Sequence, residues 1–307
     1  MFTNLYRFVP SRTAENEFDI LLIDEAHRIE KSSNHQYTRP ADRTDMPQIN
    51  QLIRCAKTSV FFIDDRQKVR SQEAGNSDLI RNAASEAGAT IREVTLETQY
   101  RCMGSNDYLL WIESVLGYSE DKRILLKNEI FDFRIMSSPS EIMEILKEKE
   151  AEKANSARMV AGFCWPWSSK TDANGDLIKD VRIGDFAMPW ETHDKITRTP
   201  PGYVKWFEWA YRPEGIKQVG CIYTAQGFEF DYIGVIIGND LRYDPLSDSL
   251  TGDISASKDP MLKRDVQTFD MHVKNIYRTL LTRGMKGCYV FFTDKGTEDF
   301  FRNRMES

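Results

Sequence analysis

The stretch DILLIDEAHRI, residues 19–29, decides the fold class of this chain. Four apolar residues run directly into the acidic pair Asp24–Glu25, a pattern typical of a buried parallel strand whose carboxyl end faces a ligand crevice. At such an edge the first acid can hold Mg²⁺, and the second can orient an attacking water as a general base. The alternative interpretation is a core strand that ends in a solvated acidic pair.

Short apolar runs alternate with helical runs along the chain, which predicts α/β architecture with mostly parallel sheets. The predicted strands span 18–24, 58–64, 90–96, 132–138, 157–167, 218–224, 230–238 and 288–294, and the predicted helices span 46–56, 76–88, 107–117, 139–154 and 272–284. Polar, turn-forming residues dominate 242–266, so we expect a surface insertion there. A boundary after residue 100 would separate a 1–100 domain from a 101–307 domain.

The composition is that of a soluble globular protein, with 41% hydrophobic and 29% charged residues. The net charge of −6 means that nucleic-acid binding would need a local basic groove. No apolar window is long enough to cross a membrane, and the N-terminus lacks an apolar signal core. The five cysteines show no CxxC spacing, which favours a reducing, cytoplasmic location.

Four further motifs follow the acidic pair in a fixed order: FFIDDRQ (61–67), ETQYR (97–101), TAQGFEFD (224–231) and YRTLLTRG (277–284). The series resembles motifs II to VI of superfamily 1 helicases of the UvrD-like type. It is most similar to the Schlafen group 3-like DNA/RNA helicase domains of bacteria, over residues 18 to 294. The resemblance implies two RecA-like lobes of the P-loop NTPase fold, ATP and Mg²⁺ as cofactors, and single-stranded DNA or RNA as partner.

The same resemblance implies roles for individual residues at a nucleotide held between the two lobes. In the first lobe, Asp24 would ligate Mg²⁺, Glu25 would activate water, and Gln67 would sense the γ-phosphate or the attacking water. Around the second lobe, Tyr100 would stack on adenine, Arg101 would reach the γ-phosphate, Gln226 and Gly227 would couple nucleotide to nucleic acid, Glu229 would bind the ribose, and Arg283 would be the arginine finger.

The periodicity of the last helix bears on Arg283. On a wheel of ~100° per residue, an apolar stripe passes through Val273, Ile276, Tyr277, Leu280 and Leu281. Arg283 falls at the edge of this stripe, where it can reach into a cleft, and Arg278 points toward solvent. The alternative role of Arg283 is a favourable charge near a helix C-terminus. Gly227 similarly permits either a close approach to a ligand or an ordinary tight turn.

Aromatic residues offer a possible nucleic-acid surface. Trp206, Trp209 and Tyr211, with Trp165 and Trp167, could stack bases, and packing in the core is the alternative.

The phosphate-binding loop that such a site needs is absent. None of the 17 glycines is followed by Lys, so no G-x-x-x-x-G-K-[ST] occurs. Only 18 residues precede Asp19, fewer than the roughly 30 of a strand–loop–helix crossover. We therefore expect a first lobe truncated at its N-terminus, negligible ATP hydrolysis by the chain alone, and a missing N-terminal segment or subunit that carries the loop. The second hypothesis is a non-catalytic module that binds nucleic acid or protein on a helicase-derived scaffold. A third, an unrelated metal-dependent hydrolase, is disfavoured by the ordered arginines.

Overall fold

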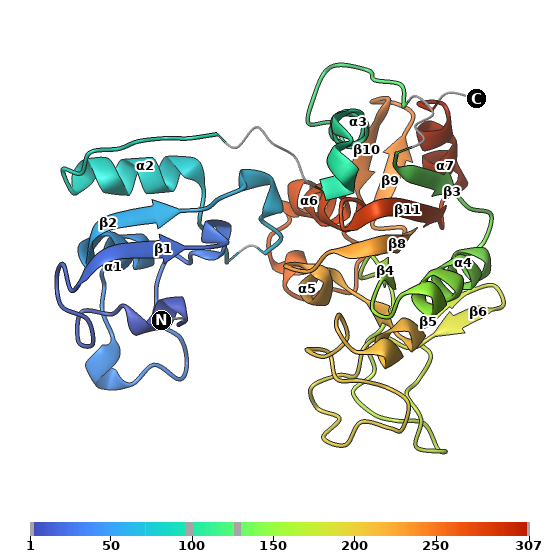
Figure 1. The fold of residues 1–307 in the computed structure, drawn as a ribbon, viewed down its shortest axis with the longest axis horizontal. Helices are drawn as coiled ribbons and strands as arrows, with labels where there is room; N and C mark the ends of the chain where they lie inside the picture. Colours follow the sequence, from blue (N-terminus) through green and yellow to red (C-terminus); the bar gives the residue numbers. More distant parts are fainter. Residues whose placement is uncertain (1–2, 71, 96–100, 126–129, 306–307) are drawn as a thin grey trace. The chain divides into compact units, whose positions relative to one another are not determined.

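The computed structural model describes residues 3–70, 72–95, 101–125 and 130–305 (Figure 1). The chain divides into two compact units, Met1–Thr95 and Leu96–Ser307. The second unit contains a five-stranded sheet in which all neighbouring strands are parallel, so the predicted mixed α/β class is confirmed. Among the described residues, no helix combines the length and the apolar composition needed to cross a membrane.

The first unit is built on a two-stranded parallel sheet. Its elements are η1 (Leu5–Arg7), β1 (Phe18–Ile23), η2 (Ala26–Arg28), η3 (Pro40–Asp42), α1 (Gln48–Arg54), β2 (Ala56–Phe61), η4 (Asp65–Gln67) and α2 (Ser77–Glu86). The pairing runs from Phe18 with Ala56 to Ile23 with Phe61, so both strands end at the same edge. α1 and α2 pack together against one face, where Ile23 is buried with side chains of both helices.

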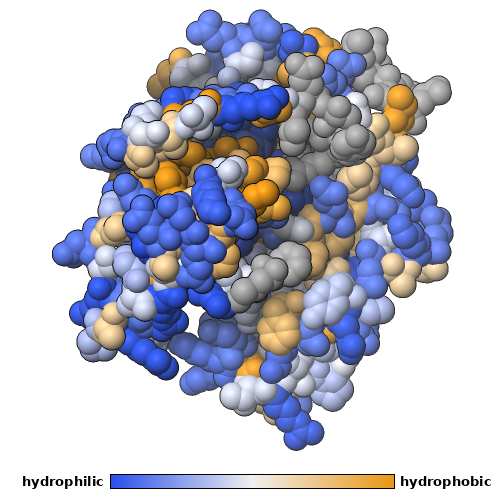
Figure 2. Space-filling model, turned by 60° about the vertical axis from the view of Figure 1, so that its left-hand side comes forward, coloured by the Kyte–Doolittle hydropathy of each residue, from blue (hydrophilic) through white to orange (hydrophobic). Residues whose placement is uncertain are grey.

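The other face of this sheet carries apolar side chains that remain exposed. Ile20 and Leu22 are 63% and 64% exposed, and Phe62, just past β2, is 47% exposed. Figure 1 shows no helix of the described part of this unit over that face, and Figure 2, in which the unit is turned forward, shows apolar groups at the surface. Parallel sheets normally bury both faces, whereas the described residues of this unit cover only one face of the β1–β2 sheet.

The strand predicted at 90–96 is wrong over its described residues, 90–95, which form neither helix nor strand. Val94 is 71% exposed, and Glu93 is held by an ion pair with Arg81 of α2 at 2.7 Å. The alternating pattern that suggested a strand therefore has no paired neighbour here, and an alternating pattern forms a strand only where a sheet edge receives it.

The second unit carries the larger core. Its elements are η5 (Arg101–Gly104), α3 (Asn106–Val115), β3 (Asp132–Ile135), α4 (Pro139–Glu152), β4 (Ala157–Ala161), β5 (Val181–Ile183), β6 (Phe186–Met188), η6 (Pro213–Lys217), β7 (Val219–Gly220), α5 (Ile222–Ala225), β8 (Phe230–Ile237), β9 (Leu241–Asp244), β10 (Ser249–Gly252), η7 (Leu262–Arg264), α6 (Phe269–Leu281), β11 (Gly284–Phe292) and α7 (Lys295–Arg302). The strand order is β3-β11-β8-β4-β7. α4 packs on one face, where Gly234 of β8 lies directly under Ile142 and Leu146. The predicted stripe of α6 is confirmed, because all five of its residues are buried.

Two other expectations need correction in this unit. The predicted strand 218–224 is only two residues long, since Cys221 and Thr224 form a capping box that starts α5 instead. The expected surface insertion at 242–266 is partly a packed hairpin, β9–β10, in contact with α6 and α7. Leu250 in that hairpin is buried, which explains why a segment of polar composition is ordered.

Candidate functional site

The acidic pair Asp24–Glu25 follows β1 directly, at the edge where β2 also ends. The amide of Ala26 donates to the carbonyl of Phe62 at 2.9 Å, and the amide of Phe62 donates to the carbonyl of Ile23 at 2.8 Å. These two hydrogen bonds continue the sheet pairing past the strand ends. The acids are therefore held by backbone on both sides, at the position the sequence predicted.

Glu25 adopts a left-handed backbone conformation, with φ 52° and ψ 45°. Its amide donates to Oδ1 of Asp24 at 2.9 Å, and its carbonyl accepts from the amide of Arg28 at 2.9 Å. A non-glycine residue in this region costs of order 1–2 kcal/mol, and such strain concentrates at functional sites. The carboxylate of Glu25 on this turn is about one third exposed.

His27 is buried beneath this turn, with its Nε2 atom 3.2 Å from Oε2 of Glu25. Burial lowers the pKa of His27 below its ordinary value, against the opposing effect of the Glu25 carboxylate. The imidazole is therefore neutral at pH 7, and its Nε2–H can donate to Glu25. Such a hydrogen bond orients the carboxylate without neutralising it, as a general base requires.

Gln67 lies at the end of the neighbouring strand, in η4. Its side chain is buried, and its Nε2 donates to Oδ2 of Asp64 at 3.1 Å. Asp64 also caps η4 by accepting the amide of Arg66 at 3.0 Å. The carboxyl edge of the two-stranded sheet thus gathers two acids after β1 and an acid–amide pair after β2.

The loop that follows η4 is hydrogen-bonded to the backbone next to the acidic turn. The amides of Ala74 and Gly75 both donate to the carbonyl of Ile29, at 2.7 and 2.9 Å. Gly75 passes so close to the turn that a Cβ there would stand 2.0 Å from the carbonyl oxygen of Ala26. Only glycine fits at this approach, so the conformation of the acidic turn depends on residue 75.

In the second unit, Arg283 and the turn at 226–229 lie together. Arg283 is buried, its Nε donates to the carbonyl of Thr279 at 3.2 Å, and a terminal nitrogen donates to the carbonyl of Phe228 at 3.3 Å. Gly227 has φ +91°, so the tight turn, one of the two interpretations of its sequence, is present. Gln226 is buried at the C-cap of α5, and Glu229 is exposed.

The positions that the helix wheel predicted for Arg278 and Arg283 differ from those in the structure. The helix ends at Leu281 with Thr282 as its C-cap, so Arg283 lies beyond the helix and braces the turn before β8. The expectation that Arg278 meets solvent is wrong: its guanidinium pairs with Glu113 of α3 at 3.0 Å, because α3 packs on that side of α6. The finger role of Arg283 stays a prediction.

The adenine-stacking residue Tyr100 lies outside the described residues, and of Arg101 only the backbone is described, at the start of η5. Two residues of the acidic edge received no role from the sequence, His27 and Asp64. The signal for Asp64 was its place at the end of an apolar run. No sequence signal pointed to His27, because its contact with Glu25 depends on a left-handed turn that the sequence pattern does not predict.

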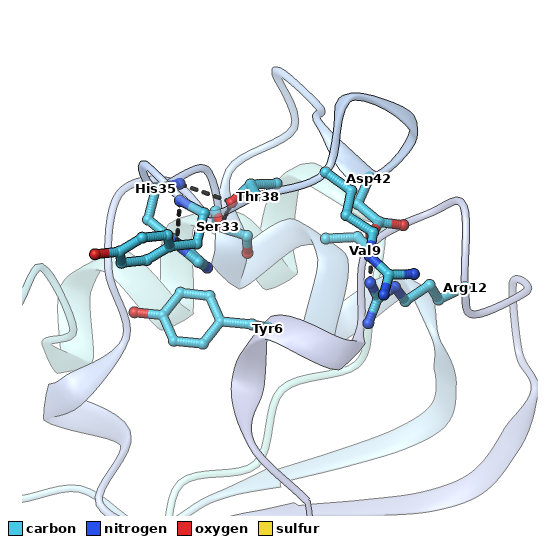
Figure 3. Close-up of a pocket in the computed structure, with 9 residues that line it drawn as sticks. Tyr6, Val9, Arg12, Ser33, His35, Thr38 and Asp42 are labelled. Carbon is cyan, nitrogen blue, oxygen red and sulfur yellow. Dashed lines mark hydrogen bonds and ion pairs between the residues drawn. The ribbon is translucent and has the colours of Figure 1, made fainter.

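A separate cavity of about 120 Å³ lies in the first unit, between η1 and the loop that leads into η3 (Figure 3). Arg12 and Asp42 form an ion pair on one side, and on the other the ring of Tyr6 meets His35 edge-on at 5.1 Å. None of the predicted site residues lines this cavity. It is therefore distinct from the acidic edge.

Comparison with known proteins gives two matches. Residues 1–294 match the model of the family described as Schlafen group 3, DNA/RNA helicase domain. An uncharacterized protein of Saccharomyces cerevisiae is 27% identical over 306 residues, which cover 90% of this chain and 63% of the yeast protein. The chain thus spans less than two thirds of the length of this relative.

Proposed function

The chain belongs to the Schlafen group 3 DNA/RNA helicase domain family, and we propose from this membership that it supplies part of a nucleic-acid-dependent ATPase. In the complete protein, ATP hydrolysis would be coupled to movement along single-stranded DNA or RNA. The observation that carries the proposal is the acidic edge of the first unit, where Asp24, Glu25 and the Asp64–Gln67 pair stand at the ends of adjacent parallel strands.

Each group at this edge suits a task in phosphoryl transfer. Asp24 is exposed and keeps carboxylate lone pairs beyond the one given to the Glu25 amide, so it fits a Mg²⁺ ion that takes its remaining ligands from phosphates and water. Bound Mg²⁺ would supply charge neutralisation for ATP. Glu25, oriented by neutral His27, would accept the proton of the attacking water. Gln67 would position that water or contact the γ-phosphate.

The second unit would supply the groups that respond to the nucleotide. Arg283 would stabilise charge on the γ-phosphate, and the turn at 226–229 would contact the ribose through Glu229. The contact between Arg283 and the carbonyl of Phe228 supports a coupled movement of these two elements. Release of Arg283 toward a phosphate would break that hydrogen bond and alter the turn.

The absent phosphate-loop motif limits what the chain does alone. Without the loop amides and its Lys, the β- and γ-phosphates have no cradle, and Mg²⁺ has no Ser/Thr ligand. We propose that a segment carrying G-x-x-x-x-G-K-[ST] completes the site, on the same polypeptide or on a subunit. The second candidate function, a non-catalytic nucleic-acid- or protein-binding module, is favoured by this same absence.

Phosphate release from ATP with single-stranded DNA tests the proposal. The chain alone is expected to show no turnover, and the chain joined to a loop-bearing segment is expected to hydrolyse ATP. Glu25→Gln should then lower turnover by about 10²–10⁴-fold, the usual contribution of a general base. The matched control is Asp19→Asn, an exposed acid at the opposite end of β1, which should leave turnover unchanged.

Two results would contradict the assignment. Turnover by the unaided chain that Glu25→Gln abolishes would show that no added loop is needed. Turnover by the completed protein that survives Glu25→Gln would remove Glu25 from the reaction. Single-strand binding that never responds to nucleotide, even in the completed protein, would favour the non-catalytic module.

A further inference from the structure

The segment between β6 and β7 presents aromatic side chains in an unusual way. Residues 206–211, WFEWAY, form consecutive turns in the loops that extend below the five-stranded sheet in Figure 1. Trp209 is fully buried, but Trp206, Phe207 and Tyr211 are 43%, 50% and 51% exposed. The sequence-based alternative of core packing therefore holds for Trp209 and fails for Trp206 and Tyr211.

These exposed rings stand on a rigid base. The buried guanidinium of Arg158 donates to the carbonyl of Trp209 at 2.9 Å and to the carbonyl of Arg212 at 2.7 Å, and it pairs with Glu150 at 3.2 Å. The indole of Trp209 donates to the carbonyl of Gln218 at 3.0 Å. These hydrogen bonds hold the segment at Trp209 and Arg212, so ordering the neighbouring rings on binding costs less conformational entropy.

The sequence segment that carries the rings is basic, although the chain as a whole is acidic. Between Lys195 and Lys217 there are five Lys or Arg residues and two Glu residues, a net charge of +3 in a chain of −6. The Nζ atom of Lys205 lies 5.9 Å from the ring centroid of Phe207, and Phe207 meets Trp206 edge-on at 5.4 Å. Exposed Arg212 lies one residue past Tyr211, and its Nε atom is 3.9 Å from Oε2 of Glu214, a loose ion pair that a phosphate would have to displace.

We propose that Trp206, Phe207 and Tyr211, with Lys205 and Arg212, form an aromatic platform that binds single-stranded nucleic acid. Bases stack on the rings, and the two cations pair with backbone phosphates. This inference rests on the proposed function and adds a contact surface outside the nucleotide site. Aromatic residues and arginine are also enriched at protein interfaces, so a protein partner is the competing outcome of the tests below.

Fluorescence anisotropy with labelled (dT)20 and (rU)20 oligonucleotides tests the platform. The double variant Trp206→Ala/Phe207→Ala is expected to weaken binding by about tenfold or more, since it removes stacking for at least one base. Tyr37→Ala, which removes an exposed ring in the first unit, is the matched control and should leave affinity unchanged. Far-ultraviolet circular dichroism and the urea-unfolding midpoint of each variant verify the fold.

A charge variant gives an independent measurement. Lys205→Gln/Arg212→Gln should reduce the slope of log affinity against log salt by about 1.4, because each phosphate contact to a single strand contributes about 0.7. An unchanged slope together with unchanged affinity of the aromatic variant would overturn the platform and leave the proposed function standing. Failure of the wild-type chain to bind either oligonucleotide would contradict nucleic-acid binding itself. Self-association that disappears in the aromatic variant, without oligonucleotide binding, would assign the rings to a protein contact.

Discussion

Glu191 is a buried carboxylic acid whose ionisation should set the pH dependence of stability in the second unit. The side chain is 1% exposed, and burial raises its pKa from 4.5 to about 7, although hydrogen bonds from the Cys221 thiol and the Thr224 hydroxyl to Oε1 oppose this shift. The other carboxylate oxygen, Oε2, has no hydrogen-bond partner among the described residues. Protonation of Glu191 removes a negative charge that the buried site stabilises poorly.

The sign of the effect follows from the raised pKa. Between pH 4.5 and 7 the folded state holds a proton on Glu191 that the unfolded state has released, so the free energy of unfolding falls as pH rises. The difference between the unfolded pKa of 4.5 and the folded pKa of about 7 corresponds to about 3 kcal/mol of the free energy of unfolding. This contribution to stability is fully lost above pH 7. Glu191→Gln keeps the shape of the protonated acid and cannot ionise. It should match the wild type within about 1 kcal/mol at pH 4.5 and exceed its stability by about 3 kcal/mol at pH 8.

Urea unfolding followed by tryptophan fluorescence measures this difference, because all six tryptophans lie in the second unit. Other groups whose pKa burial raises, such as Asp240, contribute equally to both proteins and cancel in the comparison. Glu144→Gln, at an exposed position of α4, is the control and should show no pH-dependent difference. A stability difference between wild type and Glu191→Gln that stays constant from pH 4.5 to 8 would refute the reasoning.

Two further substitutions probe the acidic turn and the base of the platform. Glu25→Gly should be more stable than Glu25→Ala by roughly 1 kcal/mol, because glycine adopts the left-handed conformation at φ 52° without strain. Urea unfolding followed by far-ultraviolet circular dichroism measures this difference in stability. Equal stabilities of the two variants would show that the turn is unstrained. Arg158→Met should cost about 3–5 kcal/mol, because it removes the cationic partner of the largely buried Glu150 carboxylate. The tryptophan-monitored transition measures this loss. The amides of Asn155, Ser156 and Ala157 also donate to Glu150, and a loss under about 1 kcal/mol would mean that they suffice.

Apolar periodicity correctly predicted those helices and strands that have a long apolar pattern or that pack against elements close in sequence. The acidic edge was predicted because an apolar run ending in acids determines both the strand and the place of its carboxyl end. The stripe of α6 was predicted for the same reason, since five positions at helical spacing admit one buried face.

The misplaced features depend on contacts that periodicity does not contain. The hydroxyl of Thr282 donates to the carbonyls of Arg278 and Thr279, which satisfies the end of α6 at Leu281, three residues before the predicted end at 284. This ending places Arg283 under the 226–229 turn. The orientation of Glu25 depends likewise on His27 and on the close approach of Gly75, three residues that meet only in the folded unit.

The one-sided covering of the β1–β2 sheet has a consequence for how the chain opens. Each of these strands has a single neighbour among the described residues, whereas β8 and β11 each have two. β1 and β2 therefore have fewer interstrand hydrogen bonds than β8 and β11, and one face of their sheet is exposed to solvent. A smaller fluctuation is then needed to separate β1 from β2. Amide protons of these strands should therefore exchange with solvent through brief local openings, long before the centre of the second unit melts. The acids would then be carried on a segment that opens more readily than the five-stranded sheet, and any component that covers Ile20 and Leu22 would slow these openings and stabilise the acidic turn.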